Sequence, residues 1–166
     1  MTAPAPLPAA DLPCACTTLR KASRAVARLY EAHLVEAGLS ATQFAILRAL
    51  ERRGTSNLRP LADDLVMERT SLYRAIAPLE RDGLVATEAD PSDARARRAS
   101  LTAAGHERIA AALPYWQAAQ RAFIERFGAD DYGGFVDELR RAIAQVEPAA
   151  NGGAAGGRGS LGGEDA

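Results

Sequence analysis

Residues 68–81 carry side chains whose types and spacing fit one chemical task. Leu72, Ile76 and Leu79 recur at intervals of three and four residues, which predicts a helix with one buried stripe. The other side of this helix carries short hydroxyls, an aromatic ring and guanidinium groups: Arg69, Thr70, Ser71, Tyr73 and Arg74. A helix in the major groove of DNA uses such groups on base edges and phosphates. We therefore expect this face to bind DNA, the alternative being ordinary solvated arginines.

A basic β-hairpin is expected directly after this helix. Gly83 can close the helix in a left-handed conformation. Residues 84–87 and 98–101 are predicted to be the two strands, and residues 90–95 the polar turn between them. The hairpin tip is expected to carry guanidinium groups suited to phosphates and the narrow minor groove: Arg95, Arg97 and Arg98. With a short helix at residues 61–65, the segment is predicted to be a winged helix-turn-helix.

The elements around this motif are predicted to be helices. Helix 17–37 should stop at Gly38, and a capping box formed by Ser40 and Gln43 should start the next helix. Asn57 is expected to cap the third helix, with Pro60 tolerated in its first turn.

Two further helices should follow the hairpin. Thr102 is expected to cap a long helix that runs to about Phe127, which Pro114 should kink or divide. Asp130 or Asp131 should start the last helix. The fold class is therefore mainly α (α+β), a winged helix-turn-helix with a helical dimerisation layer.

Composition limits the classes of function. The 166 residues are 48% apolar and 25% charged with a net charge of −1, which is typical of a soluble globular protein. The near-neutral balance means that DNA binding must depend on local clustering of charge. No apolar run is long enough to span a membrane and no secretory signal is evident, so we expect a cytoplasmic protein.

Low-complexity segments are expected at both ends. Residues 1–13 are rich in Pro and Ala and are predicted to be a disordered tail, and residues 148–166 are predicted to be a flexible Gly-rich tail. Between them, residues 14–147 should form one domain. Its winged helix would cover about residues 40–101, and its dimerisation helices about residues 14–37 and 102–147.

The order of these motifs resembles the MarR family of bacterial winged-helix transcription regulators. The resemblance covers about residues 14–147. It is carried by the segments Gln43-Phe44-Ala45-Ile46-Leu47, Leu61-Ala62-Asp63-Asp64-Leu65, Arg69-Thr70-Ser71-Leu72 and Leu79-Glu80-Arg81-Asp82-Gly83-Leu84-Val85. The pattern Asp93-Ala94-Arg95 followed by Leu101-Thr102-Ala103-Ala104-Gly105 also matches the family's D-x-R … L-T-x-x-G signature. Two positions depart from the family: Val66 stands where a turn glycine is common, and Pro78 falls inside the recognition helix.

The resemblance implies a homodimer that binds double-stranded DNA at a pseudo-palindromic operator and represses, less often activates, neighbouring genes. By position, Arg95 would enter the minor groove with Asp93 holding it, and Arg97 would lie beside them. Many members also have a ligand pocket between the dimer layer and the DNA-binding lobe. Residues expected to line it for an aromatic or apolar effector are Tyr30, Tyr115 and Trp116, which are otherwise ordinary core or interface residues.

Other functions remain as alternatives. Cys14 and Cys16 lie at the start of a helix, where a thiol can sense oxidants, or they are simply two small residues. No cofactor is expected, and a metal site is disfavoured because the only histidines are His33 and His106. No catalytic set is evident, so we expect no enzyme. A winged-helix protein-interaction module and an architectural DNA-binding protein are the remaining rivals.

Overall fold

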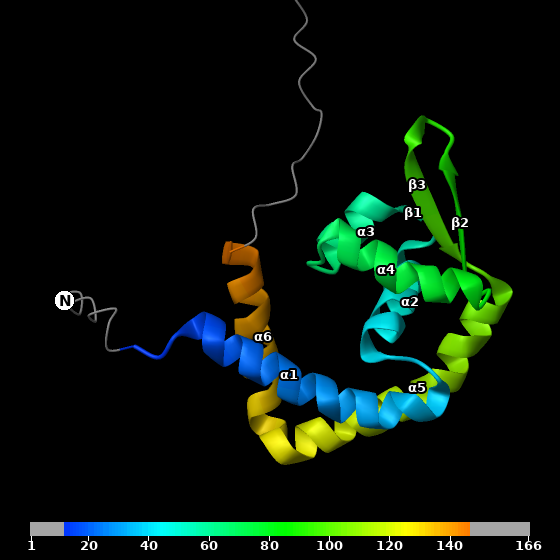
Figure 1. Cartoon of the computed structure of the whole chain (residues 1–166). Coiled ribbons are helices and arrows are strands. Elements are labelled where there is room, and N and C mark those ends of the chain that lie inside the picture. The colour runs from blue at the N-terminus through cyan, green and yellow to red at the C-terminus, as the bar shows by residue number, and fades with distance from the viewer. Residues whose placement is uncertain (1–11, 147–166) are drawn as a thin grey trace, which may run out of the picture. The chain divides into compact units, whose positions relative to one another are not determined.

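The computed structural model describes residues 12–146, except the side chain of Ala94. The expected tails at residues 1–13 and 148–166 lie outside this range, apart from Leu12 and Pro13. The elements are α1 (Ala15–Leu34), η2 (Val35–Ala37), α2 (Ala41–Arg53), β1 (Ser56–Asn57), α3 (Leu58–Asp64), α4 (Arg69–Arg81), β2 (Val85–Asp90), β3 (Asp93–Leu101), α5 (Ala103–Phe127) and α6 (Ala129–Val146) (Figure 1). The chain divides after Gly128 into two units, and α6 is described by itself. The expected fold class, mainly helical with a small antiparallel sheet, is confirmed.

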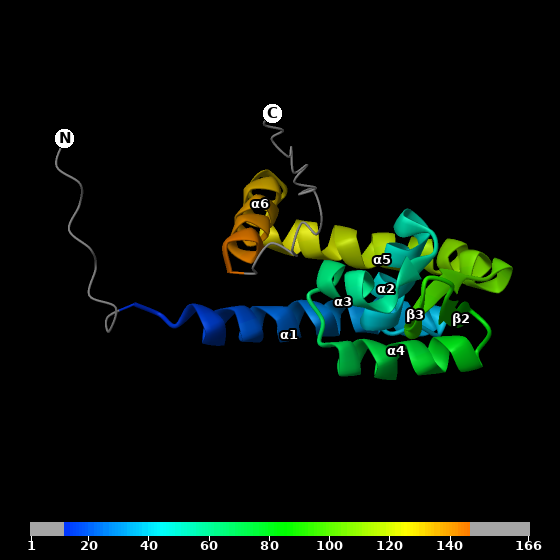
Figure 2. The ribbon, with the colours of Figure 1, turned by 90° about the horizontal axis from the view of Figure 1, so that it is seen from above.

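The core lies where α2, α3 and α4 meet. Helix α2 lies between α4 and α5 (Figure 2). The largest fully buried side chains are Leu34, Ile46, Leu47, Leu50, Leu61, Leu72, Leu79 and Val85. The predicted capping box is present, because Ser40 Oγ accepts from Gln43 N at 3.1 Å and Gln43 Oε1 accepts from Ser40 N at 2.9 Å. The predicted buried stripe of α4 is also present, and Pro78 lies inside that helix without ending it.

Helix α3 begins at Leu58, as the expected cap at Asn57 and the place of Pro60 in the first turn imply, and not at residue 61. Asn57 occupies the N-cap position as expected, but its side chain makes no capping hydrogen bond. Leu65 follows the helix and is only partly buried. Val66 in the next turn has φ 50°, the left-handed region that a β-branched residue rarely adopts. This is the turn between the two helices of the helix-turn-helix.

The sheet has three antiparallel strands in the order β1-β3-β2. Strand β1 was not predicted, and it pairs with β3 only at Ser56↔Ala99 and Asn57↔Arg98. The hairpin strands are longer than predicted, so the expected six-residue turn is wrong. Asp90 Oδ1 accepts from Ser92 N at 2.7 Å, which closes the turn within two residues and leaves the flanking polar residues free to continue the ladder.

The base of the wing is fixed to α4 and α5. Thr102 Oγ1 accepts from Gly105 N at 3.0 Å, which is the predicted cap of α5, and donates to Gly83 O at 2.6 Å. Thr102 N donates to Leu84 O at 3.1 Å. A Cβ added at Gly105 would lie 2.2 Å from Leu84 O, so this glycine permits a close approach between two backbones. Helix α5 continues through Pro114, and the predicted division there is wrong.

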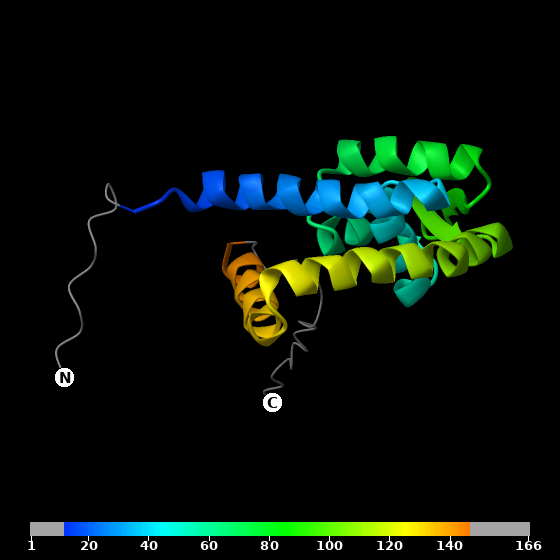
Figure 3. The same ribbon diagram turned by 90° about the horizontal axis from the view of Figure 1, so that it is seen from below.

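Helices α1 and α5 lie side by side (Figure 3). The Tyr30 hydroxyl of α1 donates a hydrogen bond to Gln120 Oε1 of α5. Helix α6 places Phe135, Leu139 and Ile143 on one face, and none of its residues is buried. Among residues 12–146, no helix is long and apolar enough to cross a membrane.

Candidate nucleic-acid interface and adjoining pocket

The outer face of α4 is a continuous polar surface. Gly83 adopts φ 70° after the helix, as predicted, and Glu68 occupies its N-cap position. The residues expected to bind DNA are all exposed: Arg69, Thr70, Ser71, Tyr73 and Arg74. Tyr73 is 45% exposed although it is a large aromatic residue. Burial of the opposite stripe fixes the helix, so these side chains are presented together to solvent.

The wing extends from the same side of the fold (Figure 1). Asp93 and Arg95 are exposed near its tip, and Asp93 Oδ1 accepts from Arg95 N at 2.9 Å. This hydrogen bond shapes the backbone from which the Arg95 guanidinium extends. At the turn, the Ser92 hydroxyl and the Ser92 N–H lower the pKa of the Asp90 carboxyl to about 2. The turn is therefore held by an ionised carboxylate over most of the pH range.

Arg97 is placed differently from Arg95. Its Nη2 atom donates to Thr87 Oγ1 and lies 3.8 Å from Glu80 Oε1. Thr87 Oγ1 in turn donates to Glu80 Oε1 at 2.5 Å. The guanidinium thus faces the seam between the wing and α4, although sequence reasoning grouped Arg97 with the DNA-contacting residues.

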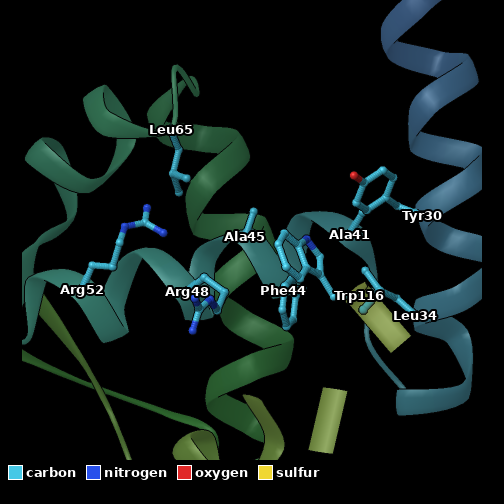
Figure 4. Close-up of a pocket in the computed structure, with 9 residues that line it drawn as sticks. All are labelled: Tyr30, Leu34, Ala41, Phe44, Ala45, Arg48, Arg52, Leu65 and Trp116. Carbon is cyan, nitrogen blue, oxygen red and sulfur yellow. The ribbon is translucent and has the colours of Figure 1, made fainter. Parts of the chain in front are cut away.

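A cavity of about 360 Å³ lies between the winged helix and the α1–α5 pair. It is lined by Tyr30, Leu34, Ala41, Phe44, Ala45, Arg48, Arg52, Leu65 and Trp116. The Phe44 and Trp116 rings stack with centroids 6.1 Å apart, between Tyr30 on one side and Arg52 on the other (Figure 4). Tyr30 and Trp116 are therefore brought together as expected, whereas Tyr115 is 39% exposed and does not line the cavity.

The two cysteines lie at the start of α1. Both are exposed, and the Thr17 hydroxyl lowers the pKa of the Cys14 thiol, with the Thr17 N–H adding to the effect. Within the described part of the chain, no group of three or more His, Cys, Asp or Glu side chains is placed to hold a metal ion.

Comparison with known proteins decides the family. A profile of the MarR family matches residues 39–96. The transcriptional regulator HosA of Escherichia coli O157:H7 is 30% identical over 130 residues, which cover 75% of this chain and 96% of HosA. The chain belongs to the MarR family. The M. tuberculosis regulator MosR, solved in complex with DNA, is 32% identical with a TM-score of 0.68, covering 81% of this chain and 100% of MosR.

A second solved structure gives the same result. A probable transcriptional regulator from Pseudomonas aeruginosa is 26% identical with a TM-score of 0.70, covering 78% of this chain and 96% of that protein. This MarR-family chain is accordingly a winged-helix, DNA-binding transcription regulator, and the relatives named here are regulators rather than enzymes.

Sequence reasoning did not find several residues of these sites. Arg48 and Arg52 line the cavity, but in the sequence they resemble surface charges of α2. Glu80 and Thr87 hold Arg97, yet the three residues are far apart in the sequence. Glu80 lies seven residues before Thr87 and seventeen before Arg97, and Thr87 lies ten before Arg97. Only the strand register could have revealed that contact. Ala89 pairs with Arg97, and Thr87, two residues before Ala89 on β2, lies on the same face of the hairpin as both.

Proposed function

We propose that this MarR-family protein is a homodimeric repressor that binds a pseudo-palindromic operator and is released by a small effector. The observation that carries the proposal is the exposed polar face of α4 beside an exposed basic wing. Arg69, Thr70, Ser71, Tyr73 and Arg74 would meet the major groove, and Asp93 and Arg95 the minor groove. The relative MosR was solved in complex with DNA, which supports this assignment.

The dimer is proposed from apolar surface that one chain leaves uncovered. The first half of α1 is exposed throughout, including Leu19 at 46%. An apolar hollow of about 290 Å³ between α1 and α5 is lined in part by Leu29 and Phe123. Helix α6 has an apolar stripe but no buried residue. A second copy would cover such surfaces, and sedimentation equilibrium measures whether it does.

The test of DNA binding uses the DNA upstream of the protein's own gene, with unrelated DNA as competitor and the salt concentration varied. Arg74→Ala and Arg95→Ala should each weaken binding about tenfold or more, because a base or minor-groove contact is worth about 1–3 kcal/mol. Arg140→Ala is the matched control, since Arg140 is an exposed arginine of α6 paired with Asp137.

The two rival classes predict other results in the same experiment. An architectural protein would bind both DNAs alike, with affinity governed by salt. A protein-interaction module would bind neither DNA. Either result would overturn the repressor proposal.

The cavity is proposed as the effector site, and its lining favours an aromatic acid. Phe44 and Trp116 offer apolar ring faces, while Arg52 supplies positive charge and Arg48, which is paired with Glu51, offers further guanidinium N–H donors. Trp116 is the single tryptophan of the chain, so its fluorescence reports on occupancy. Aromatic carboxylates should quench it and release DNA, and the neutral amide of the same ring is the control. Equal effects of acid and amide would contradict the assignment to Arg48 and Arg52.

A thiol-based oxidant sensor is the second candidate function. It is favoured by the exposure of Cys14 and Cys16 and by the lowered pKa of the Cys14 thiol, since the thiolate is the form that peroxide oxidises. Replacing both cysteines with Ser should abolish release of DNA by peroxide. Release that persists in this variant would exclude the candidate.

A further inference from the structure

We propose that Arg97 is a positioning residue, which holds the wing at a fixed angle to the recognition helix through Glu80 and Thr87. We call these three residues the wing clamp. The inference rests on the proposed DNA binding by α4 and the wing, and it assigns a role to Glu80, an acidic residue on a surface that must approach phosphates.

The clamp joins three elements. Glu80 lies near the end of α4, Thr87 on β2 and Arg97 on β3. Glu80 Oε1 accepts from Thr87 Oγ1 at 2.5 Å and lies 3.8 Å from Arg97 Nη2, which also donates to Thr87 Oγ1. The Arg97 charge is thus compensated by a carboxylate of the same protein. Among the described residues, no carboxylate lies within ion-pair distance of Arg95, two positions closer to the tip.

The place of the clamp gives it a mechanical role. Strand β1 supports β3 only at Arg98 and Ala99, so between Arg97 and the tip the wing is a two-stranded ribbon. Such a ribbon is marginally stable by itself in water. The hydrogen bonds of Thr102 hold its base at Gly83 and Leu84. The clamp adds an attachment to α4 beyond those that Thr102 and β1 provide, and it lies where the two-stranded part of the wing begins. An attachment at this position limits how far the ribbon can change its angle to α4.

The clamp contributes little to global stability. The side chains of Arg97 and Glu80 are 50% and 46% exposed, and exposed ion pairs stabilise proteins only slightly. Its effect is expected in binding, because a wing ordered before it meets DNA has less conformational freedom to lose.

Glu80→Gln separates the clamp from simple electrostatics. Removing a negative charge from a DNA-binding surface ordinarily strengthens binding. The clamp predicts the opposite, a three- to tenfold loss of operator affinity. Glu88→Gln is the matched control, because Glu88 is exposed on β2 and points to the other face of the hairpin. It should leave affinity unchanged or raise it.

Arg97→Gln, and the variant that combines it with Glu80→Gln, complete a double-mutant cycle. The clamp predicts that Arg97→Gln, Glu80→Gln and their combination lose similar affinity, with the salt dependence of binding unchanged. If Arg97 instead binds a phosphate, its loss should lower the slope of log K against log salt by about 1. Glu80→Gln should then strengthen binding. Those two results together would overturn the proposal.

Hydrogen exchange of the free protein tests the clamp without DNA. Amides of residues 86–90 and 93–97 should exchange faster in Glu80→Gln and Arg97→Gln than in the wild type, with exchange in α2 unchanged. Unchanged wing exchange would overturn the proposal even if the wild type binds its operator. Faster exchange in a protein without operator preference would uphold the clamp while the proposed function fails.

Discussion

Gly105→Ala should destabilise the protein even though alanine is the better helix former. Gly105 lies in the first turn of α5, three residues after the capping residue Thr102. An alanine Cβ would lie 2.2 Å from Leu84 O and 3.2 Å from Leu101 Cδ2. The first of these contacts is with backbone, which cannot rotate away. The start of α5 must therefore move from the α4–β2 junction by roughly 1 Å to reach an ordinary contact distance.

The magnitude follows from three effects. Overpacking a fixed site costs about 1–3 kcal/mol. The movement also weakens the hydrogen bond from Thr102 N to Leu84 O, now 3.1 Å long, which contributes about 0.5–1.5 kcal/mol. The helix propensity of alanine returns about 0.5–1 kcal/mol. We expect a net loss of about 2 kcal/mol in the free energy of unfolding, which lowers Tm by about 5–10 °C.

Thermal and urea unfolding monitored by circular dichroism measure this loss. Gly133→Ala is the matched control, because Gly133 is also helical but a Cβ there meets nothing within 4 Å. The control should unfold at the wild-type temperature or above it. If Gly105→Ala unfolds with the control, the close backbone approach imposes no cost, and the reasoning is refuted.

Three further changes test other features. Val66→Gly should raise the free energy of unfolding by about 0.5–1 kcal/mol, because relief of the left-handed strain exceeds the entropy cost of glycine. Urea unfolding measures this free energy, and a lower value in the variant would show that Val66 is not strained. Asp90 has its pKa lowered from 3.8 to about 2, so its stabilisation is present above pH 4 and lost as the pH falls towards 2. Asp90→Asn should therefore make Tm depend less on pH between about 4 and 2. The same dependence in the variant and the wild type would show that the Asp90 carboxylate does not stabilise the fold. Ser40→Ala should cost about 1 kcal/mol through loss of the cap, whereas Thr42→Ala beside it should not.

Features set by short stretches of sequence were predicted from the residues. The Ser40–Gln43 box, the Thr102 cap and the left-handed Gly83 each depend on groups within three residues of one another. The buried stripe of α4 follows from its own periodicity. Together with the family's motif order, these signals identified the winged helix-turn-helix.

Features set by distant contacts were not predicted. One missed feature is local: the Asp90 carboxylate closes the hairpin turn within two residues, which is tighter than the polar composition suggested. Strand β1 has two residues, too few for a periodic signal. Arg97 and Arg95 are alike in sequence, and only the packing of the wing on α4 gives Arg97 a carboxylate partner. Pro114 was expected to kink or divide α5, and the helix is not divided there; it packs along α1 and α2 on both sides of the proline.

The continuity of α5 makes it a lever. Its 25 residues span about 37 Å, and Thr102 at its first turn is bonded to the base of the wing. A tilt of about 5° about the Phe127 end would carry Thr102 through about 3 Å, close to the rise of one base pair. A small rotation of α5 at its Phe127 end would therefore shift the wing along DNA by about one base pair.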